Sequence, residues 1–314
     1  MGCRFTKSYL AVIMMSSIQI YKPTSSVYGT DIYGKHISGL SYSTGDFAEN
    51  IIEDIFEISS SIRDLTDEDI LRDPSNHLRT IFQRLDHLIA LDIYDKSAEA
   101  ILYDSEFNLA FDTIARFRSL YTAKLEIEHA HSILESRDPW EMLTNFNYIS
   151  NYLKLSLTEF QGAGLKRGDS VVFLGSGPLP LTLMVLCHWY GLKGIGIEKE
   201  PDRAELSRKV LEKLGLSGQI EIINGDHLTL PLKTKSELIM IAAQAEPKKE
   251  IFNHLANVLP AGTKLSYRIY EKGLRRLLDT FYLFELPVQL KEYHRVRPEP
   301  PVNNTVVFAT KEVS

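Results

Sequence analysis

VVFLGSGPLPLT, residues 171–182, is the stretch that decides the fold of this chain. The apolar run at its start predicts a buried parallel strand. The glycines at 175 and 177 then let the backbone turn sharply and approach a ligand without a Cβ in the way. We therefore predict that Gly175, Ser176, Gly177 and Pro178 form a turn that holds a nucleoside.

Two prolines follow the glycines at positions where nucleotide-binding turns usually continue with glycine. Pro178 and Pro180 are tolerated where a helix begins, because the first amides of a helix have no intrahelical acceptor and a fixed φ suits the first turn. They also remove two amides from any phosphate cradle. This loss disfavours a dinucleotide and favours a cofactor without phosphates.

The residues after the turn continue the pattern of alternating strands and helices. A second short strand, residues 194–197, ends in Glu198, about 20 residues beyond the glycines, where an acid can accept hydrogen bonds from both ribose hydroxyls. Pro201 opens a helix over residues 202–214, and Gly215 closes it. We predict Glu198 as the ribose ligand.

Asp226 and Phe173 refine the prediction of the ligand. Asp226 follows a third strand, residues 219–223, at the place where an acid receives the adenine amino group in S-adenosylmethionine-dependent folds of this type. Methyltransferases of this shape usually carry an acid two residues before the first glycine, which holds the amino group of the methionine moiety. In this sequence that position is Phe173. Loss of the acid is compatible with a methionine moiety rotated out of its usual pocket, and the alternative is that Phe173 simply packs behind the turn.

The chain resembles the nicotianamine synthases, and it looks closest to their short microbial members. The resemblance rests on five motifs of this sequence: GSGPLPLT at 175–182, Glu198-x-Glu200-Pro201, Pro139-Trp140-Glu141, Tyr267-Arg268-x-Tyr270 and Val302-Asn303-Asn304-Thr305. It implies transfer of the 3-amino-3-carboxypropyl group of S-adenosylmethionine to the amine of a glutamate-like amino acid or an alkylated intermediate. It also implies release of 5′-methylthioadenosine and a metallophore as the product.

The resemblance also implies a general base. The α-amino group of an amino acid has a pKa of roughly 8, so most of it is protonated at neutral pH and a carboxylate must take the proton. The family's glutamate matches Glu126, in the segment KLEIE at 124–128, and Tyr152 matches its partner. Burial would raise the pKa of Glu126 towards that of a useful base. The alternative is a solvated helix face, because acids on long helices are mostly at the surface.

A second set of polar residues lies near the predicted C-terminal strands. Arg268 continues a strand that begins near residue 263, and its guanidinium can make a bidentate contact with a substrate carboxylate. A structural ion pair is the equal alternative. Asn303 and Asn304 precede the last strand, residues 305–309, where they can bind a carboxylate or close a turn, and the turn is favoured.

Three regions divide the chain. We predict a variable N-terminal extension over residues 1–40, an all-α bundle over 41–165 and a Rossmann-like S-adenosylmethionine-binding domain over 166–314, an α/β fold overall. The bundle includes a long helix over 107–130, whose apolar face contains no glycine or proline, and a helix over 150–160. The proline-containing segment 295–301 is interpreted as a loop.

Composition excludes several partners. The hydrophobic content of 44% is enough for two hydrophobic cores. The net charge of -6 gives no positive field that would attract a nucleic acid. The apolar run 9–20 is short of the roughly 18 residues that cross a bilayer, so we expect no membrane partner. The chain has two cysteines, Cys3 and Cys187, which are too few for a disulfide framework. We therefore expect a reducing compartment, the cytoplasm. A small-molecule amino-acid substrate is the expected partner, and a homodimer is left open.

Two further functions remain open on the same residues. An ordinary small-molecule methyltransferase would use the same fold, and a non-catalytic binding module would retain the nucleotide pocket. No metal site is expected, because His129 and His131 lie two residues apart on a helix and point in different directions.

Overall fold

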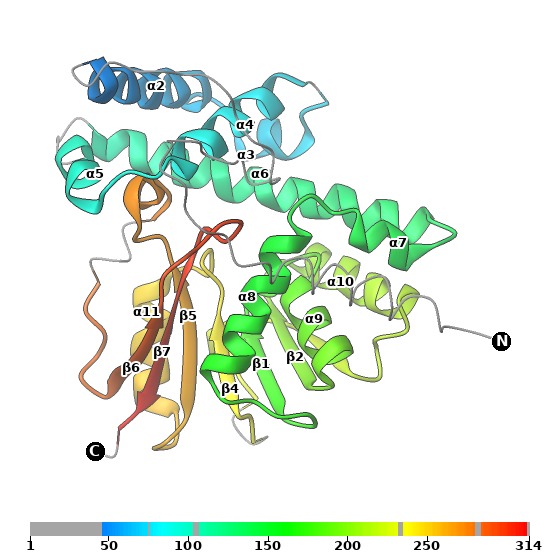
Figure 1. Cartoon of the computed structure of the whole chain (residues 1–314). Coiled ribbons are helices and arrows are strands. Elements are labelled where there is room, and N and C mark those ends of the chain that lie inside the picture. Colours follow the sequence, from blue (N-terminus) through cyan, green and yellow to red (C-terminus); the bar gives the residue numbers. More distant parts are fainter. Residues whose placement is uncertain (1–45, 75, 103–106, 232–234, 280–283, 313–314) are drawn as a thin grey trace, which may run out of the picture.

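The computed structural model describes residues 46–74, 76–102, 107–231, 235–279 and 284–312. The predicted extension over residues 1–40 and Cys3 lie outside these ranges. The first described elements are all helices, followed by a sheet whose strands alternate with helices (Figure 1). This order agrees with the α/β prediction, a helical part followed by a Rossmann-like part.

Among the described residues, seven helices precede the sheet. Their bounds are α2 (Asp46–Ile62), α3 (Asp67–Arg72), α4 (Asn76–Ala90), α5 (Asp95–Leu102), α6 (Phe107–Glu135), α7 (Pro139–Thr144) and α8 (Ile149–Gly162). Their apolar residues recur at helical spacing and are buried together, as Ile55, Ile58 and Leu85 are.

The long helix α6 is the centre of the helical part. Its 29 residues exceed the predicted range because the apolar face continues to Ile133, which is fully buried. Phe117 and Tyr121 pack against Phe82 of α4, with ring centroids 6.3 and 4.5 Å from that of Phe82. These aromatic contacts fix α6 against its neighbours.

A seven-stranded sheet has the order β3-β2-β1-β4-β5-β7-β6. All neighbours pair in parallel except β7, which is antiparallel to both β5 and β6. The bounds are β1 (Ser170–Leu174), β2 (Lys193–Glu198), β3 (Ile220–Asn224), β4 (Leu238–Ile241), β5 (Lys264–Ile269), β6 (Leu290–Val296) and β7 (Thr305–Lys311). The parallel connections run through α9 (Leu181–Tyr190), α10 (Pro201–Lys213) and α11 (Lys248–Val258).

Successive residues of β1 point to opposite faces of the sheet, and each face has its own apolar cluster. Val171 and Phe173 belong to the cluster that includes the helical part, whereas Val172 and Leu174 belong to the cluster with α11. Figure 1 shows α8 and α9 in front of the sheet, α11 behind it and α6 across one end of the strands. The helical part and the sheet therefore share one continuous apolar cluster, on one face.

One prediction is wrong in part. Arg295 and Val296, interpreted as the beginning of a loop, are the last residues of β6. The sequence did not predict β6 because it is an edge strand, paired on one side only. Of its seven residues only Leu290 is buried. A strand without alternating apolar residues gives no periodic signal.

Candidate active site

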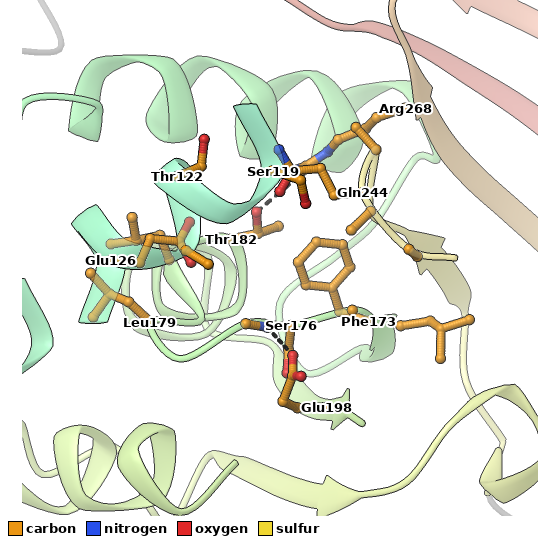
Figure 2. A pocket seen from close by; sticks show the side chains of 18 of the residues that line it. Ser119, Thr122, Glu126, Phe173, Ser176, Leu179, Thr182, Glu198, Gln244 and Arg268 are labelled. Carbon is orange, nitrogen blue, oxygen red and sulfur yellow. Dashed lines mark hydrogen bonds between the residues drawn. The ribbon is translucent and has the colours of Figure 1, made fainter. Parts of the chain in front are cut away.

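A cavity of about 190 Å³ lies between α6, α8 and the carboxyl ends of β1, β2, β4 and β5. In open α/β sheets this edge is where ligands bind. The wall includes every residue predicted for the site: Glu126, Tyr152, Gly175, Ser176, Gly177, Pro178, Glu198, Asp226 and Arg268. Figure 2 shows Glu126 and Thr122 on one side of it and Ser176 and Glu198 on another.

The glycine turn closes one wall of the cavity. The amides of Gly175 and Ser176 donate to the carbonyl of Ile197, at 2.9 and 3.1 Å, which ties the turn to the end of β2. Gly175 has a φ of +79°, and a Cβ there would lie 3.2 Å from the Cβ atoms of Ala242 and Ala245. The turn therefore needs glycine both for its backbone conformation and for its close approach to the segment after β4.

The two prolines lie where the sequence placed them, before a helix. Helix α9 begins at Leu181, Pro180 occupies the N-cap position, and Pro178 lines the cavity. At Pro180, φ is -76° and ψ is 59°, so the proline stands outside the first helical turn rather than within it. Two positions of this turn therefore offer no backbone donor to a ligand.

Glu198 lies at the end of β2 beside the glycine turn. Its Oε2 accepts a hydrogen bond from the amide of Gly177 at 2.9 Å, and its Oε1 accepts one from the amide of Glu200 at 3.0 Å. The side chain is only 5% exposed. Two backbone donors thus fix the orientation of the carboxylate, and its contact with a ribose stays a prediction.

Asp226 follows β3 and is exposed at the edge of the cavity. Its Oδ1 accepts a hydrogen bond from the amide of Leu228 at 2.8 Å and caps the short helix η1 (His227–Thr229). The cap holds the carboxylate in one position beside the cavity. Its contact with an adenine amino group stays a prediction.

Glu126 and Tyr152 meet across two helices. The Tyr152 hydroxyl on α8 donates to Oε1 of Glu126 on α6, at 2.7 Å. Glu126 is 8% exposed, so the alternative of a solvated helix face is wrong for it. That alternative describes Glu128 instead, whose side chain is 57% exposed and pairs with Lys124 at 3.0 Å.

Burial changes the acid–base chemistry of this pair. It raises the pKa of Glu126 to about 7; the Tyr152 hydrogen bond opposes this rise, and the charge of Glu198 adds to it. Burial likewise raises the pKa of Tyr152 well above its ordinary value, and the neighbouring Glu126 adds to that rise. Glu126 can therefore take or release a proton near neutral pH, while Tyr152 stays a hydrogen-bond donor.

Gly177 brings the glycine turn against this carboxyl group. Its φ is +75°, and a Cβ built there would lie 2.9 Å from Oε2 of Glu126. The same glycine donates its amide to Glu198. Gly177 therefore lies beside both carboxylates: it donates to Glu198, and it leaves no room for a side chain next to Glu126.

Arg268 makes its bidentate contact within the protein. Its Nε and Nη2 donate to the two carboxylate oxygens of Glu159, at 3.1 and 2.7 Å, and Nη2 also donates to the Thr182 hydroxyl at 2.9 Å. The guanidinium carbon lies 5.1 Å from the ring centroid of Phe173. The structure therefore shows the ion pair that was the alternative prediction, on a side chain that also lines the cavity.

Sequence reasoning missed four charged residues in the cavity wall, Lys199, Arg203, Glu246 and Arg118 of α6, and Arg118 is the most deeply buried of them. It is 6% exposed and forms an ion pair with Asp86 of α4, whose Oδ1 lies 3.1 Å from its Nε. Asp86 and Arg118 are 32 positions apart in the sequence, on helices whose packing no local pattern predicts. The sequence signal that could have found Arg118 is its helical spacing from Glu126, because residues about two helical turns apart can line the same cavity.

The histidines, cysteines and helices of the described ranges offer no further chemistry of the kinds considered from the sequence. Nε2 of His129 donates to the carbonyl of Met142, 2.8 Å away, and no three His, Cys, Asp or Glu side chains in the described ranges gather as a metal site. Cys187 is a buried free thiol in α9, as its position in an apolar helix predicted. None of the helices within the described residues has the length and apolarity to cross a bilayer.

The strand order, the glycine turn after β1 and the acid at the end of β2 define a Rossmann-like protein of the S-adenosylmethionine-binding class. A family profile described as nicotianamine synthase protein matches residues 44–314. The chain therefore belongs to the nicotianamine synthase family, which confirms the predicted resemblance.

Solved structures agree with this assignment. A mutant of MtNAS in complex with S-adenosylmethionine is 31% identical, with a TM-score of 0.72 over 87% of this chain and 100% of that chain. MtNAS in complex with MTA and tNA is also 31% identical, with a TM-score of 0.70 over 87% of this chain and 99% of that one.

Curated relatives match a shorter region. L-histidine 2-aminobutanoyltransferase of Yersinia pestis is 25% identical over 173 residues, which are 55% of this chain and 63% of the relative. Nicotianamine synthase of Solanum lycopersicum is 29% identical over 198 residues, 58% of this chain and 61% of the relative. The matches therefore span less than two thirds of the length of these relatives.

Proposed function

We propose that the protein transfers the 3-amino-3-carboxypropyl group of S-adenosylmethionine to the amine of an amino acid and releases 5′-methylthioadenosine. The observation that carries the proposal is the buried Glu126–Tyr152 pair, placed against the glycine turn. Family membership supports it. So do the solved structures, in which MtNAS is in complex with S-adenosylmethionine, or with MTA and tNA.

The glycine turn and the acids after β2 and β3 hold the donor in this proposal. Glu198 accepts from the ribose hydroxyls, Asp226 receives the adenine amino group, and the turn lies beside the adenosine. Phe173 offers no charge to the ammonium of the methionine moiety. Its apolar ring therefore leaves the amino-acid arm without the usual anchor of a methyltransferase, and the arm turns towards α6 and α8.

Glu126 then acts as the general base. It takes a proton from the ammonium of the acceptor, and the freed lone pair attacks the methylene carbon bonded to sulfur. The new C–N bond forms as the C–S bond breaks, and the bonding electron pair stays on sulfur to give a neutral thioether. Tyr152 orients the carboxylate through its hydrogen bond. All three carbons on the sulfonium are electrophilic, so the position of the amine selects the arm over the methyl group.

The acceptor is an α-amino acid in this proposal, glutamate or histidine, or an already alkylated intermediate. Histidine is the acceptor in the name of the Yersinia relative, and the family description names nicotianamine. Products with several amino and carboxylate groups chelate metals, and a metallophore is the product that we propose.

Product analysis tests the function. The purified protein is incubated with S-adenosylmethionine and each amino acid, and the products are separated by mass spectrometry. We expect 5′-methylthioadenosine and an acceptor heavier by one or more aminobutyrate units. Formation of S-adenosylhomocysteine with a methylated acceptor would establish a methyltransferase instead, and donor binding without consumption would establish a binding module.

A further inference from the structure

Arg118 shares α6 with the proposed base. It lies eight residues before Glu126, which is about 12 Å along the helix axis, and both side chains line the cavity. Thr122 lies between them and also lines the cavity. One face of α6 thus presents a cation at one end and a general base at the other.

The Arg118 side chain is held in place on three sides. Its Nε pairs with Oδ1 of Asp86 at 3.1 Å, and Asp86 is held in turn by the Tyr148 hydroxyl, which donates to its Oδ2 at 2.8 Å. Its Nη1 donates to the Thr122 hydroxyl, and its guanidinium carbon lies 4.6 Å from the ring centroid of Phe82. The guanidinium is therefore compensated in charge and fixed in orientation before any ligand binds.

Two guanidinium nitrogens have no hydrogen-bond acceptor among the described residues: Nε, which lies 3.1 Å from Oδ1 of Asp86 without hydrogen-bond geometry, and Nη2. None of the described residues accepts a hydrogen bond from Nη2 of Arg118, although the side chain is more than nine-tenths buried and lines the cavity. Nε is fully buried, whereas Nη2 is not among the fully buried unpartnered nitrogens, so Nη2 is the one that a ligand in the cavity can reach. A donor on a largely buried side chain is costly unless a partner satisfies it. Its natural partner is an anionic oxygen that enters the cavity with a ligand.

Arg268 has a parallel arrangement on the other wall. Glu159 occupies its Nε and Nη2, Thr182 shares Nη2, and none of the described residues accepts from Nη1. This arginine lies over Phe173, on the wall of the glycine turn. Besides Lys199 and Arg203, the cavity wall therefore holds two guanidinium groups that are fixed by buried carboxylates. The reaction brings at least two carboxylates, one on the arm of the donor and one on the acceptor.

We propose that Arg118 binds a carboxylate of the amino-acid acceptor through Nη2 and thereby selects acceptors that carry this carboxylate. The inference rests on the proposed function. The acceptor is assigned to Arg118 because this arginine shares a helix with Glu126, which must reach the amine of the acceptor. Arg268 is nearer the glycine turn and is left for the arm of the donor.

The test compares an acid with its amide. The better acceptor of glutamate and histidine is assayed beside its carboxamides, which keep the shape and remove the charge. The wild-type protein should prefer the carboxylate by about tenfold or more in kcat/KM over at least one carboxamide, because a charge-assisted hydrogen bond becomes a neutral one. The double variant R118M/D86N removes both members of the ion pair, so that no buried charge is left alone.

In R118M/D86N the preference should fall to within about twofold, through a higher KM for the acceptor, with the KM for S-adenosylmethionine unchanged. The matched control is R116M on the same helix, because Arg116 pairs with Asp67 and does not line the cavity. Its preference should remain that of the wild type. A second variant, R118K, keeps a cation for Asp86 but lacks the second guanidinium nitrogen, and should lose the preference even if the double variant does not fold.

A preference retained in R118M/D86N or R118K would overturn the inference, and so would a wild-type protein that does not distinguish the acid from any of its amides. Failure of the proposed function has a different signature, which is no release of 5′-methylthioadenosine from the wild-type protein with any acceptor.

Discussion

The two carboxylates that meet at Gly177 are both almost completely buried, yet they have different surroundings. Glu198 accepts hydrogen bonds from two backbone amides, which hold it at the end of β2. Glu126 accepts one hydrogen bond, from the Tyr152 hydroxyl, and burial raises its pKa to about 7. The sheet wall therefore provides a fixed acceptor for a ligand, and the helical wall provides a group that exchanges a proton.

This difference follows from where each partner comes from. The donors to Glu198 belong to the glycine turn and to its own loop, so local sequence builds that wall. Tyr152 lies 26 positions after Glu126, on another helix, so only packing of α6 against α8 builds the other wall. In the proposed mechanism, the wall that binds the donor is thus encoded by local sequence, and the wall that carries the general base is built by tertiary packing.

The largest effect should come from E126Q, which removes the proton acceptor. We expect transfer to slow by roughly 100-fold or more, while S-adenosylmethionine binds with nearly unchanged affinity. Rates are measured as 5′-methylthioadenosine release, and binding by calorimetry. E128Q is the matched control, since Glu128 is exposed on the same helix and should leave both quantities unchanged. Wild-type turnover in E126Q would remove Glu126 from the mechanism.

The same variant should change stability in a pH-dependent way. The pKa of Glu126 rises from an ordinary 4.5 to about 7 on folding. The free energy of unfolding therefore decreases as the pH increases from 4.5 through about 7. At pH 8, E126Q should have a free energy of unfolding higher by up to about 3 kcal/mol, and at pH 4 the gain should vanish. Urea titrations at the two pH values measure this difference, and an equal gain at both would show that Glu126 is not buried as an anion.

G177A should have a smaller effect, of about tenfold on transfer, because a misplaced catalytic group is costly. Its Cβ would lie 2.9 Å from Oε2 of Glu126, at a φ of +75°. G215A is the matched control, with a φ of +71° and no atom within 4 Å of the added Cβ. Both variants should lose about 1 kcal/mol of stability from backbone strain, but only G177A should lose activity. Equal transfer rates in G177A and G215A would show that the position of the glycine turn does not affect Glu126.

Y152F should give the smallest change in rate, less than about tenfold at pH 8. The Tyr152 hydrogen bond lowers the pKa of Glu126, so without it that pKa rises further above its ordinary value. The acidic limb of the kcat/KM profile, which the wild-type protein should show near pH 7, should therefore move to higher pH. A limb that stays in place in Y152F would mean that another group controls it.

Much of the sheet wall could be predicted from sequence. The glycines, the prolines before α9 and Glu198 follow one another within one strand–turn–helix unit, whose spacing has a direct structural meaning. Strand β6 could not be predicted, because its exposed residues show no alternation.

The helical wall was predicted only in part. The resemblance supplied Glu126 and Tyr152 and left burial or exposure of Glu126 as alternatives, but it did not supply the close approach of Glu126 to Gly177. Periodicity treats Arg118 as a surface residue, whereas packing buries it beside Asp86. The same limit applies to Arg268, whose partner Glu159 lies 109 positions away.

A crystal structure with S-adenosylmethionine bound tests most directly whether the two walls divide the work in this way. The division predicts adenosine beside the glycine turn, with the methylene carbon of the aminocarboxypropyl arm facing Glu126 and the methyl group turned away from it. A methyl group directed at Glu126, or a turn that holds no adenosine, would contradict it.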